Sequence, residues 1–308
     1  MNIVRFVMCL SLSSSLMAAQ TPWLFVAKDV TSLHRLPPTV RLAYGAEAEE
    51  FGLLRLPKGP GPYPVAIIIH GGCWLSRIPK SNTVVNVDNT EALADALRNI
   101  GVATWNIEYR RVDQPGGGFP GTFLDVAQAA DYLREIAPKY HLNLDKVVVV
   151  GHSAGGHLAL WLSSRTALNA ESPLYAPHPL ALQAAISLGG VPDLKLARKP
   201  AEEGCRADVI GQLLGSDQPE VLEARYAQTS PMEMLSAQVP QILFAGEEDK
   251  VVPEAFAMLY VQKAQAANKP VQLRKIAFSG HHEYIVPNSV VWPVLYKELN
   301  ALLGLGAP

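Results

Sequence analysis

The sequence has little charge, few cysteines and no long apolar segment after its N-terminus. Charged residues make up 18% of the 308 residues and hydrophobic residues 49%, a balance that excludes a disordered chain or a coiled coil. The 26 Lys and Arg residues are scattered among 28 Asp and Glu residues. Because nucleic acids and anionic membranes bind basic surfaces, neither is expected as a partner. The composition therefore predicts a soluble, globular protein.

Residues 1–19 have the features of a secretory signal peptide. A single Arg5 precedes the apolar, Ser-diluted stretch 6–17, and the segment ends at Ala18 and Ala19. A buried N-terminal helix is the alternative interpretation. We expect cleavage after Ala19 and a mature protein free in the periplasm or the medium. No apolar run of about 18 residues follows, so no membrane span is expected.

Cleavage would leave two of the three cysteines, Cys73 and Cys205. In an oxidising compartment these two residues can form a disulfide, although two separate buried thiols are the alternative. No His, Cys or Asp cluster has zinc-ligand spacing, and no Gly-x-Gly-x-x-Gly opens a helix after a strand. We therefore expect neither a metal nor a cofactor. The sequence does not indicate an oligomeric state.

Short apolar runs alternate with helical segments after an N-terminal hairpin. Such runs are typical of strands buried on both faces of a parallel sheet. The predicted hairpin strands are 40–44 and 51–56, and the central strands are 65–69, 102–107, 147–150, 182–188, 241–244 and 271–276. The predicted helices are 89–98, 123–136, 153–165, 254–267 and 290–303.

This alternation predicts an α/β fold, a doubly wound and mostly parallel sheet of about eight strands with helices on both faces. Residues 20–308 are expected to form one domain. The polar, glycine-broken segment 199–234 is predicted to be a small lid insertion. Ligands of such sheets bind at the carboxyl ends of the strands.

The segment Gly151-His152-Ser153-Ala154-Gly155 lies between a predicted strand and a predicted helix. Gly-x-Ser-x-Gly in this position is typical of a sharp turn that exposes a nucleophilic serine above the sheet. An ordinary glycine-rich turn is the alternative, and the strand before and the helix after argue against it. The pattern indicates that Ser153 is a nucleophile.

A serine nucleophile needs a base and a carboxylate that orients the base, in the order Ser, acid, His. Three carboxylates, Glu247, Glu248 and Asp249, follow the strand 241–244, and the short side chain of Asp249 best suits a fixed orienting role. The base should follow the last strand, where His281 and His282 both qualify. Adjacent residues point in different directions, so only one of them can face Ser153.

The oxyanion of an acyl-transfer intermediate needs hydrogen-bond donors. His70-Gly71-Gly72-Cys73-Trp74 directly follows the strand 65–69, where its glycines let backbone N–H groups turn toward the reacting carbonyl. We expect the N–H groups of Gly72, Cys73 and Ala154 to be these donors. A tight turn without this role is the alternative.

Together these motifs resemble the α/β-hydrolase superfamily, specifically the His-Gly-Gly-x-Trp esterases related to arylformamidases (kynurenine formamidases) and to the hormone-sensitive-lipase group. The resemblance covers about residues 50–305. In this family Gly-His-Phe-(Asp/Glu) carries the base directly after glycine, and here the segment reads Gly280-His281-His282-Glu283, which implies His281. The segment 106–111 is similar to the group's Asp/Glu-Tyr-Arg motif. Cys73 stands where the lipase group has a third glycine, a departure that backbone donors tolerate.

These residues predict a metal-free serine hydrolase that cleaves carboxylic esters, with Ser153 as nucleophile, His281 as base and Asp249 as orienting acid. An amide hydrolase of arylformamidase type is the main alternative, since the same machinery cleaves a formyl amide. A serine peptidase and a catalytically silent binding protein are weaker alternatives. Trp74, Tyr109 and Phe119 are expected to line a compact pocket for short acyl groups, roughly C2 to C6. Core or surface packing is the alternative for each of the three.

Overall fold

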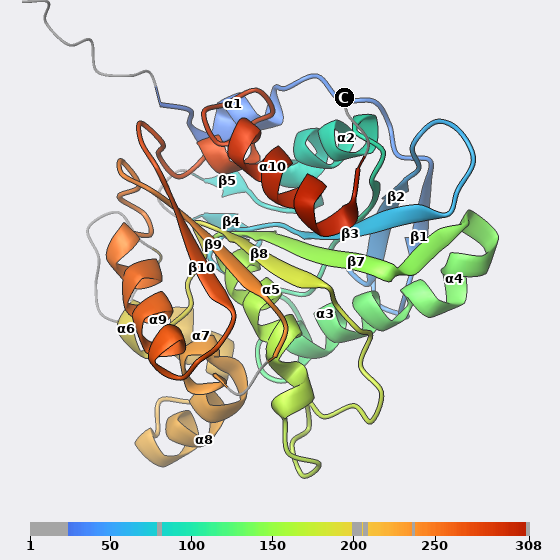
Figure 1. Ribbon diagram of the computed structural model, residues 1–308. Coiled ribbons are helices and arrows are strands. Elements are labelled where there is room, and N and C mark those ends of the chain that lie inside the picture. Colours follow the sequence, from blue (N-terminus) through green and yellow to red (C-terminus); the bar gives the residue numbers. More distant parts are fainter. Residues whose placement is uncertain (1–23, 79–81, 199–204, 206–208, 236–237, 306–308) are drawn as a thin grey trace, which may run out of the picture.

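An eight-stranded sheet forms the centre of the molecule (Figure 1). The computed structural model describes residues 24–78, 82–198, 205, 209–235 and 238–305. The predicted signal peptide, residues 1–19, lies outside these ranges, as do residues 199–204 and 206–208 of the predicted lid.

The strand order is β1-β2-β6-β3-β7-β8-β9-β10, with β1–β2 and β2–β6 antiparallel and every later pair parallel. Thus the predicted doubly wound, mostly parallel sheet is confirmed. The strands of this sheet are β1 (Val40–Ala43), β2 (Phe51–Arg55), β3 (Tyr63–Ile69), β6 (Ala103–Ile107), β7 (Leu142–His152), β8 (Ala184–Leu188), β9 (Gln241–Gly246) and β10 (Val271–Ile276). A small separate hairpin consists of β4 (Arg77–Ile78) and β5 (Thr83–Val84).

Helices cover both faces of the sheet (Figure 1). One face carries α1 (Ala27–Thr31), α2 (Glu91–Asn99) and α10 (Trp292–Leu303). The opposite face carries α3 (Gly121–Asp131), α4 (Leu133–Tyr140), α5 (Ala154–Ser164) and α9 (Glu254–Ala266). The remaining helices are α6 (Leu194–Ala197), α7 (Val209–Leu214), α8 (Pro219–Thr229) and the short 3₁₀ turns η1 (Val87–Thr90), η2 (Arg165–Ala167), η3 (Pro231–Glu233) and η4 (Glu283–Ile285).

The central strands are apolar throughout because both of their faces are covered. In β3, Val65, Ile67 and Ile69 belong to the core beneath α3 and α5, whereas Ala66 and Ile68 belong to the core beneath α2 and α10. Successive side chains of a strand point to opposite faces, so two cores need a continuous apolar run. The same reasoning explains the four consecutive valines of β7.

Two segments differ in detail from the sequence prediction. The expected helix 123–136 is divided at Tyr132 into α3 and α4. Here the Tyr132 carbonyl accepts the N–H of Glu135, three residues on, with an N···O distance of 2.9 Å, which tightens the turn. Part of the segment predicted as a polar lid is helical. Its helices α7 and α8 bury apolar side chains, among them Ile210 and Leu213, in the core beneath α5.

Candidate active site

The turn between β7 and α5 holds Ser153 in a strained backbone conformation. Ser153 has φ 54° and ψ −120°, in the left-handed half of backbone space that residues with a side chain rarely adopt. The close packing of the turn explains Gly155, since a Cβ there would lie 2.2 Å from the carbonyl oxygen of Ile69. This geometry is that of a nucleophile turn at the carboxyl end of β7, where the sequence predicts one.

The loop after β9 places one carboxylate against one histidine. Asp249 Oδ2 accepts a hydrogen bond of 2.8 Å from His281 Nδ1, and Asp249 Oδ1 accepts the N–H groups of Val251 (3.0 Å) and Val252 (2.9 Å). The Asp249 side chain is fully buried, whereas Glu247 and Glu248 are exposed. A carboxylate can only accept, so the Nδ1 atom of His281 carries the proton. The Nε2 lone pair is therefore available to take a proton from a nucleophile.

Of the two adjacent histidines, His281 is the one that contacts the acid. The ring of His282 meets the ring of His281 edge-on, with 5.7 Å between the centroids. Burial, together with the charge that His281 can carry, lowers the pKa of His282 to about 4. At neutral pH His282 is thus a half-buried, neutral neighbour of the predicted base.

The loop after β3, residues 71–74, lies directly against the nucleophile. A Cβ added at Gly71 would lie 2.9 Å from the Cβ of Ser153. Three consecutive residues of this loop have positive φ: Gly72 (112°), Cys73 (56°) and Trp74 (55°). Among the described residues, no hydrogen bond engages the N–H groups of Gly72, Cys73 or Ala154, the three predicted oxyanion donors. The loop has the form that an oxyanion hole requires.

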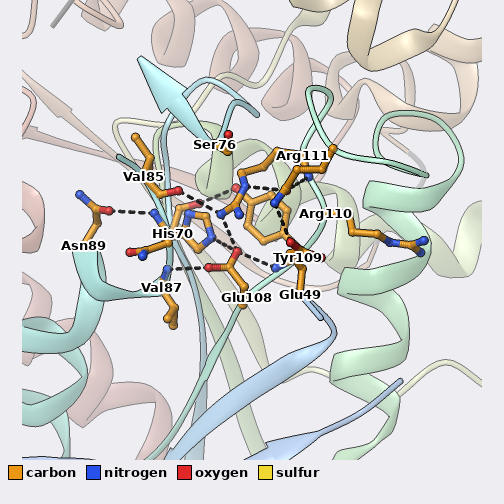
Figure 2. A network of polar contacts seen from close by, with 12 residues as sticks. Glu49, His70, Ser76, Val85, Val87, Asn89, Glu108, Tyr109, Arg110 and Arg111 are labelled. Carbon is orange, nitrogen blue, oxygen red and sulfur yellow. Dashed lines mark hydrogen bonds and ion pairs between the residues drawn. The ribbon is translucent and has the colours of Figure 1, made fainter. Parts of the chain in front are cut away.

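A buried charged network supports this loop from below (Figure 2). Glu108 Oε1 pairs with His70 Nε2 (2.9 Å) and with Arg111 Nη1 (2.6 Å), and Glu108 Oε2 accepts the Val87 N–H (3.0 Å). Burial alone would raise the pKa of Glu108, but His70 and Arg111 outweigh it and lower that pKa. Arg110 points away from this cluster and pairs instead with Asp125 (2.6 Å). Glu108 thus links the start of the oxyanion loop to the strand end of β6.

The predicted pocket residues occupy different environments. Tyr109 is fully buried, stacks on His70 with 4.4 Å between the ring centroids, and donates its hydroxyl to the His70 carbonyl (2.9 Å). Of the two expectations for Tyr109, a pocket wall or core packing, these contacts favour core packing, because its ring and hydroxyl both contact His70. Trp74 is 1% exposed and packs edge-on against His157, while Phe119 is half-buried beside Phe123.

A disulfide joins Cys73 to Cys205, across 132 positions of sequence. It connects the oxyanion loop to the segment predicted as a lid.

The supporting role of Glu108 is what reasoning from individual residues missed. Its only signal is the Asp/Glu-Tyr-Arg resemblance of segment 106–111, which does not say which side chains face inward.

The described part of the chain has neither a metal-binding cluster nor a membrane-spanning helix. Within it, no cluster of three or more His, Cys, Asp or Glu side chains is placed to hold a metal ion. No helix there is long and apolar enough to span a bilayer.

Comparison with known proteins adds a family and a set of relatives. The BD-FAE family model matches residues 54–263, more than half of the chain. LipM of Mycobacterium tuberculosis, a probable carboxylic ester hydrolase, is 26% identical over 217 residues, which cover 68% of this chain and 47% of LipM. Esterase LipC of the same organism is 26% identical over 220 residues, covering 68% of this chain and 50% of LipC. The chain therefore spans about half the length of the curated relatives it matches.

Among solved structures, esterase B from Lactobacillus rhamnosis superposes with a TM-score of 0.73. The two chains are 17% identical, and the superposition covers 90% of each. At this identity the likeness concerns the fold, and it agrees with the doubly wound sheet described above.

Proposed function

The chain belongs to the BD-FAE family, and from this membership and the site geometry we propose that it hydrolyses carboxylic esters through an acyl-enzyme on Ser153. The observation that carries the proposal is the His281–Asp249 hydrogen bond of 2.8 Å next to the strained turn at Ser153. A serine, an oriented histidine and a buried carboxylate are the parts that nucleophilic acyl transfer requires.

In the first half of the reaction, Ser153 Oγ forms a bond to the ester carbonyl carbon while its proton passes to His281 Nε2. The charge that develops on the carbonyl oxygen is stabilised by the N–H groups of Gly72, Cys73 and Ala154. Asp249 stabilises the resulting imidazolium through the His281 Nδ1–H bond. When the intermediate breaks down, the alcohol leaves with the proton from His281.

In the second half, a water molecule loses its proton to His281 and adds to the acyl-enzyme carbonyl. The same donors hold the second oxyanion, and His281 returns the proton to Ser153 Oγ as the acid is released. The positive φ values of Gly72, Cys73 and Trp74, and the close approach of Gly71 to Ser153, support the use of the same backbone donors in both halves.

The ester preference rests on the relatives. LipM is a probable carboxylic ester hydrolase and LipC an esterase, and each match covers two thirds of this chain. We expect short acyl groups, roughly C2 to C6, because Ser153 is only 3% exposed and Trp74, in the loop beside it, is 1% exposed and packs edge-on against His157.

The test is a comparison of kcat/KM for p-nitrophenyl esters of increasing chain length and for N-formylkynurenine. A maximum among the short esters, together with organophosphate labelling at Ser153, is the expected result. A formamide preference of about tenfold or more would make the arylformamidase-type reaction the answer. A maximum beyond about C10 would overturn the compact pocket. An unlabelled Ser153 would indicate a silent binding protein.

We also propose that the protein is exported. The support is the signal-like sequence of residues 1–19 together with the Cys73–Cys205 disulfide, because disulfides persist in oxidising compartments. Cell fractionation with N-terminal sequencing of the mature protein tests this. Recovery of a reduced, uncleaved chain in the cytoplasm would contradict it.

A further inference from the structure

His152 occupies the variable position of Gly-x-Ser-x-Gly, immediately before Ser153, and the reaction above does not use it. Its ring Nε2 lies 2.8 Å from the carbonyl oxygen of His281. A carbonyl can only accept, so Nε2 carries the proton and donates it across 129 positions of sequence. The residue is 6% exposed, which shields this bond from competition with water.

The same ring also contacts the oxyanion loop. A Cβ added at Gly71 would lie 3.0 Å from His152 Nδ1, so the other edge of the imidazole packs under that loop. The His152 and His281 ring centroids are 4.8 Å apart. One side chain therefore contacts the base loop and the oxyanion loop, and its own backbone is part of the nucleophile turn.

The base loop, residues 277–283, contains no regular helix or strand before the 3₁₀ turn at Glu283, and Phe278 in it has φ 57°. Its backbone is held on either side of His281, where the Ser279 carbonyl accepts the N–H of Glu248 (3.0 Å) and the Glu283 carbonyl accepts the hydroxyl of Ser289 (2.6 Å). The His281 side chain is held by Asp249 through Nδ1. The hydrogen bond from His152 restrains the backbone of His281 itself, between those two points.

We propose that His152 is a positioning residue that holds the His281 backbone in register with Ser153. Its neutral form suits this role. Burial, followed by the neighbouring His281 and His282, holds the pKa of His152 well below its usual range, so the ring adds no charge beside the base. A shift of about 1 Å in a reacting group can cost about 10²-fold in rate, which sets the scale of the expected effect.

The proposal rests on the proposed function and is tested with three substitutions. In His152→Gln the amide nitrogen can take the place of Nε2 and still reach the His281 carbonyl. His152→Asn carries the same amide on a side chain one methylene shorter, which cannot reach it, and His152→Leu has no donor. We expect kcat for a short p-nitrophenyl ester to fall by less than about fivefold in the Gln variant. In the Asn and Leu variants it should fall by about 30- to 100-fold, with KM changed little.

Hydrogen–deuterium exchange of residues 277–283 gives a readout that needs no activity. Exchange should rise in the Asn and Leu variants and stay near wild type in the Gln variant. His178→Gln, at an exposed loop histidine, is the matched control for loss of an imidazole. Circular dichroism shows whether each variant is folded, and the Gln and Asn pair remains decisive if Leu fails.

The outcomes separate this proposal from the function it rests on. If the wild-type protein hydrolyses no ester, the proposed function fails, while the exchange data still decide the positioning role. If the wild type is active but Asn or Leu equals Gln in kcat and in exchange, the positioning role of His152 is overturned and the ester-hydrolase proposal stands.

Discussion

The predicted nucleophile and the predicted base are held in place by different kinds of contact. Ser153 lies between a strand and a helix, and its backbone is fixed by hydrogen bonds to Leu188 (3.0 Å) and His157 (3.1 Å). His281 lies in an irregular loop fixed by side chains from distant segments, Asp249 on one side and His152 on another. The first position is defined by a strand and a helix that are adjacent in sequence and by the neighbouring strand β8, whereas the second depends on side chains from other loops.

The same contrast extends to the outer side of the base loop. There the carboxylate of Glu283 accepts the N–H of Phe25, 258 positions away, at 2.6 Å. The base loop therefore has contacts with the N-terminal segment, the acid loop and the nucleophile turn. Substitutions at a distance should disturb the base more readily than the nucleophile, and the predictions below test this difference.

The largest effect is expected at the nucleophile. Ser153→Ala removes the attacking oxygen, and because the three groups act as a unit we expect kcat to fall by about 10⁶. The fold should survive, since the turn keeps its glycines and its strand and helix. The measurement is kcat on a short p-nitrophenyl ester, with circular dichroism as control. Retained turnover would remove the whole mechanism.

The next effect distinguishes the two histidines. His281→Ala should lower kcat at neutral pH by about 10⁴, because no other group can take the proton from Ser153. His282→Ala should chiefly alter KM or stability, since its ring contacts the base only edge-on. Parallel kcat and KM measurements decide between them, and the reverse pattern would move the base to His282.

The sequence predicts the nucleophile turn better than the base for a physical reason. A Cβ at Gly151 would lie 2.0 Å from the carbonyl oxygen of Gly155, a contact between two residues of the motif, so the motif itself carries part of the geometry. Choosing between His281 and His282 depends on which ring faces Asp249, and reasoning from residues alone left that open. The resemblance to a known family supplied the choice, and the structure brings His281 to the acid.

The strands and the segment after β6 show the same difference between what the sequence predicts and what it does not. The apolar runs of the central strands predict burial on both faces and place β3, β6, β7, β8 and β9, whereas β1 and β2 are predicted from alternating residues and β10 exposes Gln272 and Lys275. The roles of segment 106–111 do not follow from the sequence, because Glu108 and Tyr109 both contact His70 whereas the adjacent Arg110 pairs with Asp125. The place of Tyr109 at a strand end is compatible with a pocket wall, but its hydroxyl donates to the His70 carbonyl at the start of the oxyanion loop.

The third effect concerns the network beneath the oxyanion loop. Glu108→Gln leaves Arg111 buried without a carboxylate, which should lower the free energy of unfolding by about 3–5 kcal/mol. We expect kcat to fall by about 10- to 100-fold, because His70 and the loop after it lose their anchor. Glu247→Gln, at an exposed carboxylate, is the matched control. An unchanged melting temperature and rate would show that the network does not support the loop.

The same variant has an expected pH signature. The pKa of Glu108 is lowered in the folded protein, so its ionised form contributes stability above the ordinary value of 4.5. That contribution is lost as pH falls through the lowered pKa. The gap in stability between wild type and Glu108→Gln should therefore be full at neutral pH and narrow below about pH 4.5. Denaturant unfolding across this range measures it, and a gap that widens on acidification would contradict the assignment.

The smallest effect on rate is expected from the disulfide, although it lies in the oxyanion loop itself. In the proposed reaction Cys73 acts through its backbone N–H, which Cys73→Ser retains, so kcat should fall only a few-fold. The free energy of unfolding should fall more, by about 2–4 kcal/mol, because the bond closes a long loop of the unfolded chain.

Cys205→Ser is the matched variant, since it breaks the same bond without changing a residue of the oxyanion loop. Equal melting temperatures for the two variants would assign the loss of stability to the cross-link. Thiol titration of the denatured, unreduced wild type checks the premise. Two free thiols would exclude the cross-link and leave the left-handed conformation of Cys73 and Trp74 supported by the network below them and by the Val112 N–H bond to the Trp74 carbonyl (2.9 Å).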